Sequence, residues 1–264
     1  MPKLSEWTFK GTGLAVVAVS ALAIASIAQA RADEANAKQL LKAMSDYLVA
    51  QKSISFQVDS TLEVVTKDGQ KLGLASSGSV ELSRPDKIRV TRTGGFADVE
   101  MDFDGKTLTL LGKNLNAYTQ TEIPGTVDNL VDQLREKYHR PLPAADLLLS
   151  KPYDTLMEDV IDAKDLGSGV IRGKECDHLA FRKKEVDWQI WIAQGEQPYP
   201  CRYVVSSKKV KMSPQYTIEV SDWKASAEPG SFDFTFKAPE GAKMVKPEDL
   251  KDIDEIPSHF RPKQ

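Results

Sequence analysis

Features that mark many enzymes and nucleic-acid-binding proteins are scarce in this sequence. Its three histidines, His139, His178 and His259, lie too far apart to match the short intervals at which histidines bind a metal. No serine, cysteine or carboxylate stands in a catalytic pattern around them, and no Lys/Arg stripe is interleaved with aromatic residues. We therefore expect a non-catalytic protein that has no metal or cofactor and binds no nucleic acid.

Cysteine is scarce too, with only Cys176 and Cys201 in the chain. The absence of a C-x-x-C motif argues against a redox-active pair. In an oxidising compartment, an isolated pair of cysteines usually forms a bond. We expect a structural disulfide between these two residues, with two unpaired thiols or a redox pair as the alternatives.

Neither sign of charge dominates the sequence, whose net charge is −3. Charged residues make up 28% of the chain and form no block of one sign, which excludes a polyanion as an evident partner. This composition is typical of a folded globular protein rather than of a disordered one.

The N-terminal segment has the pattern of an export signal. Lys3 and Lys10 precede an apolar stretch over Gly13–Ala28, which is shorter than the roughly 20 residues that a membrane-spanning helix needs. Small residues at 28–32 offer two A-x-A cleavage sites. We expect residues 1–32 to be a cleaved signal peptide that leaves a periplasmic protein with no stable membrane span. An uncleaved N-terminal anchor is the alternative.

The periodicity of apolar residues changes after the leader. A helical stripe over Asp33–Gln51 consists of Ala37, Leu40, Leu41, Met44 and Leu48. From Ile54 onward apolar residues recur at every second position, and Asp-Gly pairs at 68–69 and 104–105 predict tight hairpins. The sequence therefore predicts a helix followed by a meander of antiparallel strands.

Residues 72–82 form an expected strand that is unusually rich in glycine, alanine and serine. Small residues inside a strand mark bulges or bends, so we expect the sheet to curve here. After the meander, residues 126–166 carry apolar stripes of helical spacing, and a second set of strands follows over 177–236. This order fits one α+β domain over residues 33–240, in which helices cover one face of an antiparallel sheet, followed by a polar C-terminal tail at 241–264.

Three phrases of the sequence are similar to a known family. Residues 82–87 read Leu-Ser-Arg-Pro-Asp-Lys, residues 104–108 read Asp-Gly-Lys-Thr-Leu, and residues 232–242 run from Phe232 to Ala242. In this order they resemble the periplasmic outer-membrane lipoprotein carriers. The phrases at 176–182 and 186–192 look closer still to a related family of predicted periplasmic proteins, domain-of-unknown-function family 2092.

The resemblance implies a curved, unclosed antiparallel sheet, or half-barrel, covered on its concave side by helices. It also implies an apolar cavity between sheet and helices that accepts acyl chains. In the carriers, the arginine of the Arg-Pro phrase gates the helical cover, and its match here is Arg84. The helical insert at 126–166 and the phrases at 176–192 depart from the carriers, which leaves cargo and gating open.

Residues for the cavity and its cover follow from this fold. Stripes on the expected helices provide the cover, and the apolar face of the strand at 187–193 either lines the cavity or belongs to the core. The predicted ligand-binding residues are Arg84, Leu130, Leu134, Tyr138, Leu147, Leu148, Phe181, Trp188 and Ile190.

Two functions fit these expectations. The first is a soluble, non-catalytic periplasmic protein that binds acyl chains of lipids or acylated proteins as a carrier or chaperone. The second is a regulatory or structural envelope protein with a self-filled core, which binds a protein partner through a patch around Trp191.

Overall fold

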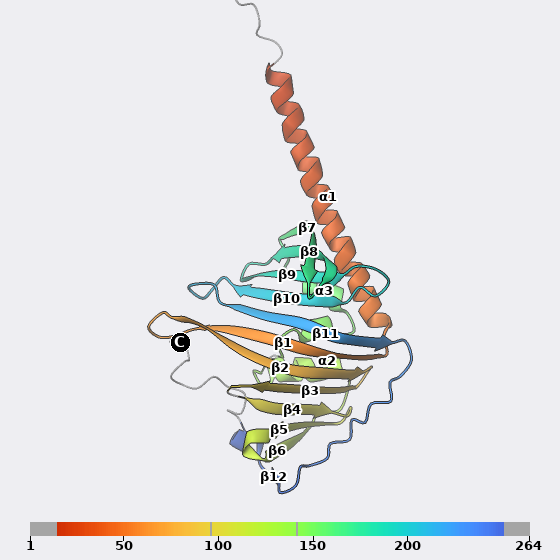
Figure 1. Cartoon of the computed structure of the whole chain (residues 1–264), viewed down its shortest axis with the longest axis vertical. Coiled ribbons are helices and arrows are strands. Elements are labelled where there is room, and N and C mark those ends of the chain that lie inside the picture. Colours follow the sequence, from red (N-terminus) through yellow and green to blue (C-terminus); the bar gives the residue numbers. More distant parts are fainter. Residues whose placement is uncertain (1–14, 96, 141, 251–264) are drawn as a thin grey trace, which may run out of the picture.

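The computed structural model describes residues 15–95, 97–140 and 142–250, and for residues 15–32 the backbone alone. The expected signal peptide therefore lies outside the described residues over positions 1–14. Its last part continues into helix α1 (Ala15–Ala50), whose N-terminal half projects beyond the rest of the molecule (Figure 1). Within the described residues, no helix is both long and apolar enough to cross a membrane.

Twelve strands of the described chain form a single sheet. They are β1 (Ser53–Val65), β2 (Lys71–Ser83), β3 (Lys87–Gly94), β4 (Asp98–Phe103), β5 (Thr107–Gly112), β6 (Ala117–Glu122), β7 (Asp162–Ile171), β8 (Lys174–Arg182), β9 (Val186–Ala193), β10 (Pro200–Ser207), β11 (Gln215–Ser226) and β12 (Lys243–Met244). Their order is β12-β6-β5-β4-β3-β2-β1-β11-β10-β9-β8-β7. Each meander is thus a run of neighbouring hairpins, and β1 joins the two meanders by pairing with β11.

The sheet is curved and does not close, since β7 and β12 stand at opposite ends of the strand order (Figure 1). This confirms the predicted α+β half-barrel. One detail differs from the expectation of a wholly antiparallel sheet, because β12 pairs with β6 in parallel. A strand that returns from a long connection can approach an edge in either direction, and the short β12 covers this edge.

The helices are α1, α2 (Val127–Glu136) and α3 (Pro152–Met157), with 3-10 helices η1 (Lys113–Leu115), η2 (Ala145–Leu147) and η3 (Pro247–Leu250). The α-helices lie on one face of the sheet, whereas η1 lies between β5 and β6 and η3 lies beside β6 at the edge of the sheet (Figure 1). The predicted stripe of α1 is confirmed, because Ala37, Leu41, Met44 and Leu48 are fully buried. This stripe packs over β7, β8 and β9 and against α3.

Helix α2 begins where the sequence predicts it. The Thr126 hydroxyl accepts a hydrogen bond from the Asn129 amide at 3.3 Å and caps the helix. The buried side of α2 consists of Val127, Leu130, Val131 and Leu134. The Val127 amide also donates to the Pro85 carbonyl at 3.0 Å, so the cis Arg84-Pro85 turn between β2 and β3 holds the start of this helix.

Two predicted boundaries are wrong. The helical insert ends before residue 166, because β7 begins at Asp162 and pairs with β8. Strand β7 lacks the regular alternation of apolar and polar residues by which strands are recognised, because it contains glycines at 167 and 169 and an exposed Leu166. The segment 232–236, expected as a strand, belongs to no ladder of the described chain. Instead the Asp233 carbonyl accepts a hydrogen bond from Arg89, and Phe236 packs on Tyr118.

The described part of the polar tail lies against the sheet. The Lys243 amide donates to the Asn116 carbonyl at 3.0 Å, and the Val245 amide donates to the Tyr118 carbonyl at 2.8 Å. Leu250, at the end of η3, is 3% exposed. Residues 227–242 therefore connect β11 to the far edge of the sheet, where β12 pairs with β6.

Candidate functional site

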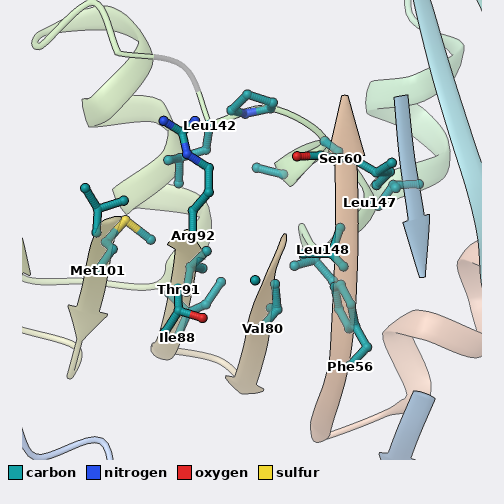
Figure 2. A pocket seen from close by; sticks show the side chains of 18 of the residues that line it. Phe56, Ser60, Val80, Ile88, Thr91, Arg92, Met101, Leu142, Leu147 and Leu148 are labelled. Atoms are coloured by element: carbon teal, nitrogen blue, oxygen red, sulfur yellow. The ribbon is translucent and has the colours of Figure 1, made fainter. Parts of the chain in front are cut away.

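A cavity of about 610 Å³ lies between the sheet and its helical cover. On the sheet side its wall consists of residues from β1 to β5 and β11. On the other side it is bounded by the end of α2, the loop after it and η2. Figure 2 shows Phe56, Val80, Ile88 and Met101 rising from the strands, with Leu147 and Leu148 opposite.

The strands place apolar side chains in this wall because alternate residues of a strand face the same side. The sheet contributes Phe56, Val58, Val80, Ile88, Val90, Val99, Met101, Leu108, Leu110, Ile218, Val220 and Trp223. The cover contributes Leu134, Tyr138, Leu142, Ala145, Leu147 and Leu148. Such a wall holds an apolar ligand by excluding water rather than by specific hydrogen bonds.

Polar side chains interrupt the apolar wall. Ser60, Arg92, His139 and Arg140 are among them, and Figure 2 shows Arg92 beside Leu142 of the cover. Tyr216 also lines the cavity. Burial raises the pKa of its phenol, while a hydrogen bond from Ser60 and the charge of Arg92 oppose that rise.

A second cavity, of about 370 Å³, adjoins the first one. Its wall is formed mainly by β1, β2, β9, β10 and β11 together with Leu156 of α3. Of the described residues, five line both cavities, namely Ser60, Arg92, Pro143, Ala144 and Tyr216. The two spaces therefore meet at these side chains and at the cover loop around 143–144.

Five of the residues predicted from the sequence line these cavities. Leu134, Tyr138, Leu147 and Leu148 line the first, and Trp188 lines the second. Their role in ligand binding stays a prediction.

Leu130, Phe181 and Ile190 were expected in the wall of the cavity, but they line neither of these two spaces. Each is at most 2% exposed and belongs to the core. For Phe181 and Ile190 the reason is that α1 covers β7–β9 and fills the space above them, whereas Leu130 belongs to the buried side of α2. Phe181, for instance, stacks on Trp188 with ring centroids 4.0 Å apart.

Arg84 lies at the cover but does not line either cavity. Its Nε and Nη2 atoms are buried and have no hydrogen-bond partner among the described residues. Burial lowers the pKa of this guanidinium, and the charge of Asp128 at the start of α2 partly opposes the effect. The side chain thus lies under the N-terminus of α2, and its gating role remains a prediction.

Most sheet residues of the wall are not among the ligand-binding residues predicted from the sequence. Their signal was present, since Phe56, Val58, Val99 and Met101 stand at alternating positions. What the alternation cannot tell is whether the opposite layer contacts these side chains or leaves a gap.

Cys176 and Cys201 are neighbours but unbonded. Their sulfurs lie 2.9 Å apart, and both residues are buried thiols. Burial raises the pKa of both, most strongly that of Cys201. The predicted pairing of these residues in space is confirmed, whereas the predicted bond is not.

The side chain of Trp191 packs against neighbouring side chains of its own sheet. His178 stacks on it with ring centroids 4.0 Å apart, and the Arg202 guanidinium lies 5.2 Å from its ring centroid. His178 also hydrogen-bonds Gln189 at 2.9 Å. Trp191 and His178 therefore have packing and hydrogen-bonding partners within the sheet, and these contacts do not favour a partner-binding patch around Trp191.

Within the parts of the chain that the structure describes, no group of three His, Cys, Asp or Glu side chains is arranged to hold a metal ion.

Comparison with known proteins identifies a family for this sequence. A family model described as predicted periplasmic protein (DUF2092) matches residues 37–246. No curated protein matches the sequence.

Solved structures resemble the fold at low identity. An uncharacterized conserved protein from Thermus thermophilus is 12% identical, with a TM-score of 0.47 over 80% of this chain and 99% of the other. Lipoprotein LppX of Mycobacterium tuberculosis is 15% identical, with a TM-score of 0.43 over 74% and 98%. A LolA superfamily protein from Nitrosomonas europaea is 13% identical, with a TM-score of 0.35 over 76% and 97%.

Proposed function

Because the chain belongs to the DUF2092 family of predicted periplasmic proteins, we propose that it is a periplasmic binding protein for acyl chains. In this proposal the protein is exported by its cleaved signal peptide and carries or shields the acyl part of a lipid or acylated protein. It performs no chemistry on the ligand.

The apolar cavity under the cover is the observation that carries the proposal. Its volume of about 610 Å³ falls in the range of ligand pockets in general, which is on the order of 300–1,000 Å³. Burial of each CH₂ group of a ligand contributes about 0.8 kcal/mol, so a long acyl chain supplies its own binding free energy. A cavity of this size also argues against the alternative of an envelope protein whose core is filled by its own side chains.

In our proposal the cover moves when a ligand enters, and two contacts at the start of α2 resist that movement. The first is the Val127–Pro85 hydrogen bond. In the second, the Ser150 amide donates to Asp128 at 3.1 Å and links α2 to the segment before α3. The side chain of Arg84, whose Nε and Nη2 atoms are buried without a hydrogen-bond partner among the described residues, is well placed to respond when the cover shifts. In our proposal it gates the cavity.

Native mass spectrometry of protein isolated from periplasm tests this function. We expect bound fatty acid or lipid, and uptake of palmitate after the protein has been stripped of ligand. Val90→Trp should fill the cavity and abolish uptake, because Val90 lines it. Thr93→Trp, on the same strand but exposed, is the matched control and should bind like the native protein. A stripped protein that takes up neither fatty acid nor lipid would exclude this function.

A further inference from the structure

Three hairpins end next to one another at one end of the sheet, namely those that join β1 to β2, β8 to β9 and β10 to β11 (Figure 1). The Lys208 ammonium donates a hydrogen bond to the Lys183 carbonyl at 2.9 Å and so links the second hairpin to the third. Glu63 of β1 accepts a hydrogen bond from the Gln215 amide at 2.9 Å and so links the first hairpin to the third. We call these three connections, residues 66–71, 183–185 and 208–214, the basic rim.

Lysine is the dominant charged residue of the basic rim. Seven lysines stand there against two carboxylates, Asp68 and Glu185. Three of the lysines pair with carboxylates of the rim or of the adjoining strands. The other four form no ion pair with a carboxylate of the described residues, and they are Lys67, Lys183, Lys184 and Lys211. This excess of positive charge is local, because the whole chain has a net charge of −3, and it favours a partner with negative charge.

Apolar side chains are exposed among these lysines. Lysine and apolar residues alternate over 209–212, and Val210 and Met212 are 41% and 46% exposed. The turn that presents them has a strained backbone, since Met212 and Ser213 adopt φ angles of 69° and 45°. Such angles cost free energy in residues other than glycine, and they are found where function requires an unfavourable conformation. The turn therefore holds two apolar side chains in solvent at a cost in stability.

An anionic lipid surface fits this combination better than an acidic protein does. Lysine is depleted in protein–protein interfaces, where long side chains must be ordered and desolvated. At a lipid surface the ammonium groups stay hydrated among the head groups, while neighbouring apolar side chains enter the boundary of the acyl region. Each lysine close to such a surface strengthens binding about fivefold, so several lysines together give stable attachment.

We propose that the basic rim docks on the surface of a membrane that contains anionic lipid. Val210 and Met212 enter the interface, and the lysines lie among the head groups. The inference does not depend on the proposed function, because a surface of this kind binds lipid head groups whatever the cavities hold.

The wall of the smaller cavity extends to the basic rim. Lys183 of the rim lines this cavity, together with Leu62 and Val186 of the strands that adjoin the rim. Leu62 is also 37% exposed. Docking through the rim therefore brings the membrane next to this part of the cavity wall.

Sedimentation with lipid vesicles tests the proposal on protein isolated from periplasm and stripped of ligand. One set of vesicles contains phosphatidylcholine alone, and the other contains equal parts of phosphatidylcholine and phosphatidylglycerol. We expect binding to be about 100-fold tighter on the vesicles with phosphatidylglycerol. Added salt should weaken it, because exposed charges are screened.

Two sets of lysine variants locate the surface. Lys67→Gln/Lys184→Gln/Lys211→Gln removes three exposed rim lysines that form no ion pair with a described carboxylate, and should weaken binding to the anionic vesicles about 100-fold. The matched control is Lys52→Gln/Lys87→Gln/Lys106→Gln, which removes the same charge from exposed positions at the opposite end of the strands. It should bind like the native protein. Thermal unfolding checks that both proteins are folded.

A further variant tests the apolar contribution. Val210→Ser/Met212→Ser should weaken binding to the anionic vesicles about tenfold, because less apolar surface leaves water. Its dependence on salt should stay that of the native protein, since no charge has changed.

The proposal is wrong if the two kinds of vesicle bind equally, if neither binds, or if the two lysine triples lose binding to the same extent. It is also wrong if the protein ignores both kinds of vesicle but binds polyglutamate through the rim lysines, which would indicate an acidic protein as the partner. Uptake of palmitate by the same preparation is measured separately. Its failure would overturn the proposed function and leave docking through the basic rim intact.

Discussion

Gly78 of β2 and Thr91 of β3 approach so closely that a Cβ atom added at Gly78 would lie 2.0 Å from the Thr91 carbonyl oxygen. The next residue, Ser79, donates its amide hydrogen to the Thr91 side-chain hydroxyl at 3.0 Å. The Ser79 and Thr91 hydroxyls lie 2.8 Å apart. The backbones of β2 and β3 therefore approach closely beside the cavity, at a position where only glycine fits without displacement of the neighbouring strand.

Gly78→Ala should destabilise the protein by about 2 kcal/mol, because the new methyl group displaces backbone rather than a flexible side chain. Gly73→Ala is the control in the same strand, since an added Cβ there meets only the Thr61 Cγ2 methyl at 3.4 Å. Chemical unfolding of both variants checks the difference. Equal stability of the two would show that the approach at Gly78 is readily relaxed.

Arg84→Met should leave the fold equally stable or raise its free energy of unfolding by about 1 kcal/mol. The reason is that two nitrogens of this guanidinium, Nε and Nη2, are buried without a hydrogen-bond partner among the described residues, which costs stability, and methionine fills a similar volume. Arg172→Met, which removes an exposed ion pair with Asp59, should change stability little. Thermal unfolding measures both. A marked loss of stability in Arg84→Met alone would contradict this account of Arg84 and indicate that it anchors the cover.

Mild oxidation should join Cys176 and Cys201, because their sulfurs are already adjacent and buried. The bond would stabilise the fold by about 3 kcal/mol, and a Cys176→Ala/Cys201→Ala protein should show no such response. In the reduced protein both thiols should react slowly with iodoacetamide, since burial raises their pKa values and disfavours the thiolate. Intact mass before and after reduction checks the bond, and two free thiols after oxidation would refute it.

Alkaline pH should destabilise the native protein through Tyr203. Burial raises the pKa of this phenol above its ordinary value of 10.0. Above pH 10 the unfolded chain therefore loses a proton that the folded chain keeps, so the free energy of unfolding falls as pH rises. The slope is about 1.4 kcal/mol per pH unit for one tyrosine.

Tyr203→Phe should remove this contribution, and adding Tyr216→Phe should remove a second one, because burial raises the pKa of Tyr216 too. Urea unfolding between pH 8 and 11 gives the slopes. An unchanged slope in the double variant would mean that both phenols ionise freely in the folded state.

Local pattern predicted much of the fold. Helical spacing identified the C-terminal half of α1 and all of α2, and the Asp-Gly pairs located two hairpins. Strand β7 was not predicted as a strand, because glycines and an exposed Leu166 interrupt its alternation of apolar and polar residues. The segment at 232–236 was mistaken for a strand because its alternating phenylalanines pack on the sheet without pairing in a ladder.

The division of apolar residues between core and cavity was less predictable. Trp188 and Ile190 stand two positions apart on β9 and face the same side. Only Trp188 lines a cavity, while Ile190 is fully buried. Alternation assigns both to one face, but it carries no information about what lies opposite.

The sheet curvature and the family resemblance could be read from the order of residues, because each depends on short stretches of neighbouring residues. The location of the cavity could be determined only from the tertiary structure. It depends on where α1 and the cover, distant in sequence, come to rest on the sheet, so that α1 fills the space over β7–β9 while the loop after α2 leaves a gap over β1–β5 and β11. Packing of distant segments is a property of the whole fold, and no local pattern records it.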